Sequence, residues 1–151
     1  AAAQMRALSD PVVAHPDPES LFTSKDKTLH RNKQAALRIM RELLQCNQWE
    51  RAGEWLSDRY IQHNPMAATG RDAAIGFLEP FFKGNPGIRY EIKRIIAEGD
   101  LVAVHSWGRF SETDRGMAVV DILRVKACKV VEHWDVLQPV PEKAANTNTM
   151  F

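Results

Sequence analysis

The sequence contains few features that would mark a disulfide-rich, membrane-spanning or nucleic acid-binding protein. Only two of its 151 residues are cysteines, Cys46 and Cys128, too few for a disulfide framework, so we expect two free thiols. No apolar run approaches the ~20 residues that a membrane-spanning helix requires. The net charge is only +1, and no block of Lys and Arg contains interleaved aromatic residues, which argues against nucleic-acid and membrane partners.

Two frequent catalytic signatures are also missing, because the chain has neither a glycine-rich phosphate loop nor a serine nucleophile elbow. What remains is ordinary globular composition, 44% hydrophobic and 26% charged, in a length that suits one domain with a core of its own. The chain begins with Ala-Ala-Ala-Gln, which resembles the small-residue end of a cleaved secretory signal but equally an arbitrary boundary. We therefore expect either a cytoplasmic or an exported protein.

The distribution of proline and small polar residues predicts three regions. Residues 1–27 contain three of the eight prolines and show no sustained period, so we expect an N-terminal arm that is extended or partly disordered. Residues 28–141 carry the periodic patterns of a folded domain. Residues 142–151 are mostly small and polar, which predicts a flexible tail.

Helical patterns come first and strand patterns follow. Apolar residues recur at helical spacing in three segments, over about 28–46, 48–56 and 70–83. A short extended piece is expected at 60–65. Alternating patterns then predict four strands, over about 88–96, 101–110, 116–125 and 129–137. This order indicates an α+β fold, in which a curled, mostly antiparallel sheet packs against three N-terminal helices and leaves a pocket between the layers.

Asp121 interrupts the third strand pattern and is the first candidate for chemistry. Side chains alternate along a strand, so Asp121 shares its face with the apolar residues Val119 and Leu123. If this face points inward, the carboxylate is poorly solvated and is suited to act as a general base near neutral pH. The alternatives are an outward Asp at a sheet edge or one paired with a buried Arg. Arg124 lies on the opposite face and cannot be that partner within the strand.

Four of the five histidines lie on or beside apolar elements, which also suggests a polar site. His105 shares a strand face with Trp107, His133 shares one with Asp135, and His63 precedes the third helix. Each histidine alone could be structural. These imidazoles and Asp135 could in principle collect as metal ligands, but no pair has the helical spacing or tight motif of known sites, so we expect no metal.

Five stretches together resemble the SnoaL-like polyketide cyclase family of the nuclear transport factor 2-like superfamily: YIQHNP, GRDA, VHSWGRF, VVDILR and VVEHWDVLQPVP. The resemblance covers about residues 30–141. It implies a conical α+β barrel with a deep pocket, and a homodimer in which the sheets pack back to back. For the founding members it also implies ring closure by intramolecular aldol condensation without metal or cofactor. Asp121 matches the Asp that removes the proton there, and His105 matches a pocket histidine by position.

The resulting hypothesis is a cyclase or isomerase, of the lyase or isomerase class, that acts on a small apolar carbonyl compound. We expect cofactor-free proton abstraction with Asp121 and His105 as catalytic residues. The expected substrate contacts are His63, Trp107, His133 and Asp135. Because one fold hosts many activities, two alternatives stay open. One is an epoxide hydrolase-like or dehydratase enzyme, in which Asp121 and Asp135 act with Arg89 or Arg109, and the other is a non-catalytic module that binds a small ligand.

Overall fold

The computed structural model describes residues 17–151, so most of the predicted N-terminal arm lies outside the described residues. Its last part forms a 3-10 helix, η1 (Pro18–Phe22), whose Phe22 is fully buried in the core. The main helices agree with the sequence prediction. They are α1 (Lys27–Arg38), which continues as the π-helical η2 (Ile39–Gln45), then η3 (Trp49–Arg51) with α2 (Ala52–Trp55), and α3 (Arg71–Gly84).

Helix α1 begins where the sequence supplies an N-cap. The Asp26 carboxylate accepts hydrogen bonds from the backbone N–H groups of Thr28 and Leu29, at 2.8 and 2.9 Å. These are two of the donors that a helix leaves unpaired in its first turn. None of the helices within residues 17–151 is long and apolar enough to cross a membrane. Cys46 and Cys128 are exposed free thiols, as expected.

Five strands form one mixed sheet in the order β1-β5-β4-β3-β2. They are β1 (Leu56–Gln62), β2 (Arg89–Glu98), β3 (Leu101–Arg109), β4 (Met117–Lys126) and β5 (Lys129–Pro139). The four predicted strands form the expected antiparallel meander, whereas β1 adds a fifth strand that pairs in parallel with β5. The α+β prediction is thus confirmed, with a curled sheet that stays open between edge strands β1 and β2.

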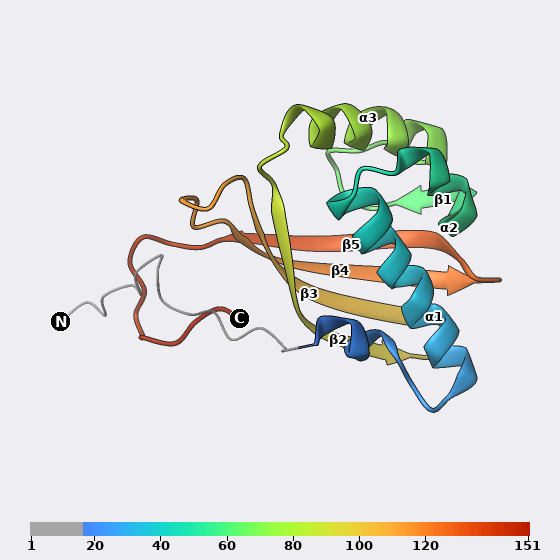
Figure 1. The fold of residues 1–151 in the computed structure, drawn as a ribbon, viewed down its shortest axis with the longest axis horizontal. Coiled ribbons are helices and arrows are strands. Elements are labelled where there is room, and N and C mark those ends of the chain that lie inside the picture. Colours follow the sequence, from blue (N-terminus) through green and yellow to red (C-terminus); the bar gives the residue numbers. More distant parts are fainter. Residues whose placement is uncertain (1–16) are drawn as a thin grey trace.

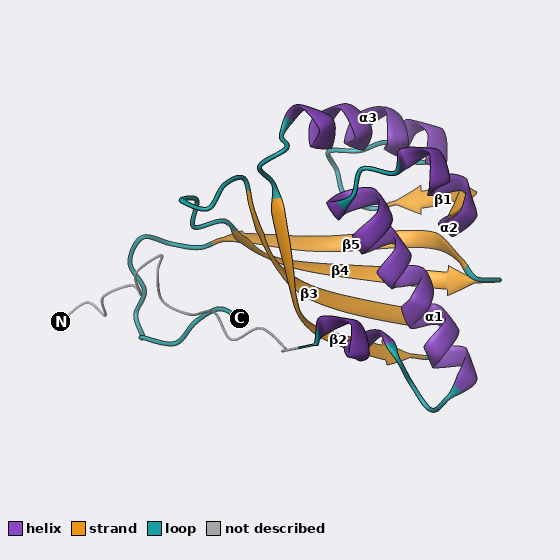
Figure 2. Ribbon diagram, in the orientation of Figure 1, coloured by secondary structure: helices purple, strands orange, loops and turns teal. Residues whose placement is uncertain are grey.

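The helices cover one face of the sheet, which we call the inner face (Figures 1 and 2). Helix α1 runs across the strands, and α3 lies beside β1 (Figure 1). Alternate strand residues, among them Val104, Leu123 and Val130, join Met40 in the main hydrophobic core beneath the helices. The opposite side of the sheet is called the outer face. Burial of apolar side chains on the inner face is therefore what fixes the orientation of β3, β4 and β5.

A tight turn at Ala127 and Cys128 connects β4 to β5. Both residues adopt positive φ, 47° and 65°, as a two-residue hairpin turn of the primed type requires. The turn pairs Val125 with Val130, and a β-bulge between Arg124 and Val125 then shifts the register, so that Asp121 lies directly opposite Asp135 and Leu123 lies opposite His133. One hairpin thus brings two carboxylates and an imidazole to the same face of the sheet.

Candidate functional site

A cavity of about 230 Å³ lies between the helices and the inner face of the sheet. Its walls are mostly apolar, with side chains from η2, α3, β4 and β5 that include Met40, Leu44, Phe77, Phe81, Leu123 and Leu137. Polar groups enter from β1 and its following loop and from the β4–β5 hairpin. An apolar cavity with a few convergent polar groups is the usual form of a small-molecule site.

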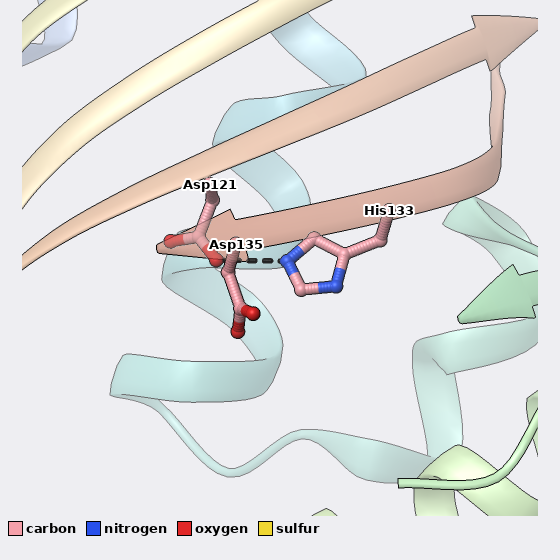
Figure 3. Close-up of side chains that lie close together, drawn as sticks. All are labelled: Asp121, His133 and Asp135. Atoms are coloured by element: carbon pink, nitrogen blue, oxygen red, sulfur yellow. Dashed lines mark hydrogen bonds and ion pairs between the residues drawn. The ribbon is translucent and has the colours of Figure 1, made fainter. Parts of the chain in front are cut away.

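Asp121, His133 and Asp135 meet in this cavity (Figure 3). His133 Nε2 lies 2.8 Å from Asp121 Oδ1, and one ligand atom from each of the three residues lies within 4.8 Å of the others. The side chains of Asp121 and His133 are each only 12% exposed. The second carboxylate oxygen of Asp121, Oδ2, is buried and has no hydrogen-bond partner within the part of the chain that the structure describes. Asp121 thus has unused acceptor capacity in an apolar surrounding.

Gln62 determines which nitrogen of His133 carries a proton. The backbone N–H of Asn64 donates to Gln62 Oε1 at 3.0 Å, which identifies that atom as the oxygen. The same oxygen lies 2.7 Å from His133 Nδ1 and can only accept, so Nδ1 must donate its hydrogen. A single proton then lies between His133 Nε2 and the Asp121 carboxylate in their hydrogen bond. His133 and Asp121 form a pair that shares a single transferable proton.

Asn64 and two tyrosines complete the polar part of the cavity. Asn64 Nδ2 donates to Asp135 Oδ2 at 2.7 Å, which holds the second carboxylate. Burial, and then the charges of Asp121 and Asp135, raise the pKa of both Tyr60 and Tyr90 far above its usual range. Both phenols therefore keep their hydrogens at physiological pH and remain hydrogen-bond donors. Gln62 Nε2 donates to the Tyr60 hydroxyl oxygen at 2.9 Å, which leaves that hydroxyl hydrogen available for another acceptor.

The charge balance of the cavity is unusual, since no Lys or Arg is present among its lining residues in the described chain. The two carboxylates lie directly opposite each other on β4 and β5, an arrangement that is unfavourable for like charges. Among the described residues that line the cavity, His133 is the only basic side chain beside the two carboxylates. The arrangement can take up, hold and release protons, and it can attract a cation.

Comparison with known protein families shows the family to which this chain belongs. A family described as SnoaL-like domain matches residues 36–133, which is more than half of the chain and includes Asp121 and His133. The chain belongs to the SnoaL-like domain family. The resemblance of the sequence motifs to this family is therefore confirmed. No curated protein matches this SnoaL-like chain in sequence.

Solved structures share the fold of the SnoaL-like chain. A proposed polyketide cyclase from Bacillus cereus ATCC 10987 is 20% identical over 91% of both chains, with a TM-score of 0.64. A proposed SnoaL-like polyketide cyclase from Jannaschia sp. CCS1 is 20% identical over 71% of this chain and 85% of that one (TM-score 0.60). A proposed ketosteroid isomerase from Kribbella flavida DSM 17836 is 21% identical over 74% and 81% (TM-score 0.59). At these identities the likeness shows the nuclear transport factor 2-like fold alone.

The structure of the SnoaL-like domain does not bring His105 to Asp121. In the β3–β4 register, Val104 lies opposite Asp121 and His105 lies opposite Val120, so the imidazole is on the outer face. Arg94 donates to His105 Nδ1 there. Partial burial, followed by the charges of Arg94 and a neighbouring lysine, lowers the pKa of His105. The geometry required for direct catalysis by His105 beside Asp121 is therefore lacking.

Trp107 shares the outer face with His105 and does not line the cavity. Its indole Nε1 donates to the Arg115 carbonyl at 2.7 Å, and the Arg109 guanidinium lies 4.1 Å from its ring centroid. The C-terminal Phe151 folds back onto this face, with ring centroids 5.9 Å from His105 and 5.5 Å from Trp107. The structure gives Trp107 no contact with the cavity, so a substrate contact by Trp107 stays a prediction. Flexibility of the C-terminal tail also stays a prediction.

His63 also lies away from the cavity. Its ring stacks on Trp134 at 4.7 Å, and its Nε2 lies 2.8 Å from Glu132 Oε1, both on the outer face of β5. Of the four substrate contacts predicted from the sequence, His133 and Asp135 lie in the cavity.

Tyr60, Gln62 and Asn64 are cavity residues that the sequence interpretation missed. They alternate with His63 in the stretch YIQHNP. Strand periodicity would have placed these three on one face and His63 on the other. The alternation of polar residues in this stretch is therefore the signal that identifies them.

Proposed function

We propose that this SnoaL-like protein is a cyclase or isomerase that removes a proton adjacent to a carbonyl group of a small apolar substrate, with Asp121 as the general base. One observation carries the proposal. The Asp121 carboxylate is fixed through Oδ1 to His133 at 2.8 Å, while its Oδ2 is buried without a hydrogen-bond partner in the described residues. A positioned, poorly solvated carboxylate in an apolar cavity is suited to proton abstraction from carbon.

The chemistry needs no cofactor where the substrate supplies an acidic C–H bond between two carbonyls. Asp121 takes that proton, and the electron pair of the C–H bond moves into an enolate. The hydroxyl groups of Tyr60 and Tyr90, which stay protonated, supply donors for the enolate oxygen. The enolate carbon then attacks a second carbonyl and forms a C–C bond, or it is reprotonated at another carbon. In the aldol case, the Asp121–His133 pair returns a proton to the new alkoxide.

The apolar walls favour a substrate with aromatic or aliphatic surface. Phe77 and Phe81 of α3 stack with each other, line the cavity and remain 44% and 39% exposed. Asn64 and Asp135 form the polar pair on the side of β1 and β5 and are suited to orient a substrate hydroxyl or carbonyl group.

An epoxide hydrolase-like reaction receives less support from the arrangement. Such a site would place Arg between Asp121 and Asp135 around a water molecule, and no Arg lines the cavity among the described residues. Arg109 stacks on Trp107 at the outer face, and Arg89 donates to nearby backbone carbonyls. A non-catalytic ligand-binding role is distinguished from catalysis by the following experiment.

The proposal is tested by hydrogen exchange at carbon. Wild type and Asp121→Asn are incubated in heavy water, after treatment with EDTA, with a panel of apolar 1,3-dicarbonyl compounds, and NMR follows loss of the acidic C–H signal. We expect wild type to accelerate exchange and Asp121→Asn to lose about 10²- to 10⁴-fold of that acceleration, the usual contribution of a general base. Glu132→Gln, in the His–carboxylate pair of the outer face, is the matched control and should retain the wild-type rate. Exchange by Asp121→Asn that is as fast as that of wild type would exclude Asp121 as the base.

A homodimer formed through the outer face remains part of the proposal. Val136 and Ile96 on the outer face of the sheet are 66% and 67% exposed, which leaves apolar surface for a second copy. Light scattering of the purified chain measures the expected doubling of mass, and a monomer at all accessible concentrations would contradict it.

A further inference from the structure

We propose that Asp121, His133 and Asp135 bind a divalent first-row transition metal ion, such as Mn²⁺ or Zn²⁺. This inference goes beyond the proposed function and does not depend on it. The sequence predicted no metal site, because Asp121 approaches the other two residues only through the register of the β4–β5 hairpin. Neither of the two other histidines considered as ligands, His63 and His105, belongs to this group.

The first support is the geometry of the three side chains. They offer two carboxylate oxygens and one imidazole nitrogen, all within 4.8 Å of one another. Ligand atoms that share one ion through bonds of about 2.1 Å lie about 3 Å apart when adjacent. Rotations of the two carboxylates about their side-chain bonds cover such a difference, because β4 and β5 already hold all three residues on one face (Figure 3).

The second support comes from the residues that surround these ligands. A metal-binding histidine nearly always donates its other ring N–H to a fixed acceptor, and metal-binding carboxylates are themselves hydrogen-bonded. His133 Nδ1–H donates to Gln62 Oε1 at 2.7 Å, which turns Nε2 toward the carboxylates. Asn64 Nδ2 donates to Asp135 at 2.7 Å. Two of the three ligands thus already have the outer hydrogen bonds that a metal site requires.

The third support is uncompensated charge. Asp121 is 8% exposed, and its Oδ2 is buried in the cavity wall with no hydrogen-bond partner in the described chain. Asp135 lies directly opposite, and no Lys or Arg among the described residues lines the cavity. Buried carboxylates are stable when they are paired or bound to metal. A divalent cation would balance both carboxylates, whereas the imidazole of His133 carries at most one positive charge.

The ligand set indicates the class of ion. One imidazole with two carboxylates suits Mn²⁺, Fe²⁺, Co²⁺ or Zn²⁺, whereas Ca²⁺ and Mg²⁺ prefer sites made only of oxygen. Three protein ligands leave coordination positions for water or for a substrate oxygen. The ion would bind the same lone pairs, on Asp121 Oδ1 and His133 Nε2, that hold the shared proton. Metal binding and base catalysis by Asp121 therefore exclude each other, and bound metal should suppress exchange.

The test is direct metal binding to the EDTA-treated chain, measured by electron paramagnetic resonance for Mn²⁺ and by calorimetry for Zn²⁺. We expect one ion per chain, and we expect Asp121→Asn, His133→Gln and Asp135→Asn each to weaken binding by at least about tenfold. Glu132→Gln at the exposed pair is the matched control and should bind as wild type does. The proposal would be overturned if wild type bound neither ion at one per chain. It would also be overturned if the three ligand variants bound metal with the affinity of wild type.

A second measurement uses wild type alone and does not depend on how well the variants fold. Co²⁺ added to the EDTA-treated chain should give visible absorption bands that shift when a 1,3-dicarbonyl probe is added, because the probe oxygen reaches an open coordination position. A spectrum identical to that of Co²⁺ in buffer would contradict the site. Exchange by the EDTA-treated chain tests the proposed function separately, so either proposal can fail while the other stands.

Discussion

His133–Asp121 and His63–Glu132 are two histidine–carboxylate pairs on opposite faces of the same sheet, each with a separation of 2.8 Å. The inner pair is 12% exposed at both side chains and has no Lys or Arg in its cavity within the described residues. In the outer pair, His63 is 41% and Glu132 is 20% exposed, and Arg124 Nε donates to the same Glu132 carboxylate at 2.8 Å.

The difference between the two pairs shows that a histidine–carboxylate hydrogen bond is not sufficient to make a catalytic or metal-binding site. At the outer face, hydrogen bonds from His63 and then from Arg124 lower the pKa of Glu132, and water screens whatever charge remains. Arg124 in turn pairs with Asp100, so the outer charges are balanced within a surface network. The inner pair is far less exposed to solvent, and no Lys or Arg of the described chain lines its cavity. Desolvation and missing counter-charge, rather than distance, give Asp121 and His133 their chemical capacity.

The largest effect on stability should come from removing the only basic group of the inner pair. His133→Leu leaves Asp121 buried without a cation, which we expect to cost about 3 kcal/mol in the free energy of unfolding at pH 7. His63→Leu at the exposed pair should change stability only marginally. Urea denaturation of both variants measures the difference.

A double variant sharpens this result. His133→Leu combined with Asp121→Asn removes the uncompensated charge, so it should recover much of the stability that His133→Leu loses. If His133→Leu and His63→Leu lost the same free energy of unfolding, burial would not make the inner pair more important for stability than the outer pair.

An intermediate effect is expected at Gln62, which has no counterpart in the outer pair. Gln62→Leu removes the acceptor for His133 Nδ1–H and for the Asn64 backbone N–H, and an unpaired buried donor costs about 1–3 kcal/mol. Gln62→Glu keeps an acceptor at the same place and should lose less. ¹⁵N NMR of the His133 ring should show a defined Nδ1–H form in wild type and a tautomer mixture in Gln62→Leu. An unchanged ring spectrum in Gln62→Leu would exclude the positioning role of Gln62.

Much of this fold could be predicted because its signals are local. Helical spacing and strand alternation gave the elements to within a few residues, and the apolar neighbours Val119 and Leu123 correctly indicated an inward Asp121. The parallel pairing of β1 with β5 could not be predicted in this way, since Ile61 and Glu132 are far apart in sequence and no turn connects their strands. Such pairings depend on tertiary packing.

The site was harder to predict because it depends on register. A shift of one residue moves every side chain of a strand to the other face. His105 and Asp121 both lie in apolar strands, but the loop between β3 and β4 sets Val104, not His105, opposite Asp121. Val102 and Val104 pack in the core and identify the inner face of β3 only once that packing is known. His133 and Asp135 reach the face of Asp121 only because a β-bulge between Arg124 and Val125 shifts the register by one residue, which the two-residue turn alone does not predict.

The smallest expected effect is the pH dependence contributed by the outer pair. The pKa of Glu132 is lower in the folded chain than its usual value of 4.5, mainly because His63 and then Arg124 hydrogen-bond to the carboxylate. The unfolded chain therefore binds more protons in this range, and the stabilisation from Glu132 is complete above about pH 4.5 and is lost as pH falls through the lower folded value. Glu132→Gln removes this contribution, so the stability difference between wild type and variant should shrink steadily below pH 4.5. Thermal unfolding between pH 3 and 7 measures it, and a difference that is constant across this range would show that the exposed pair is not coupled to folding.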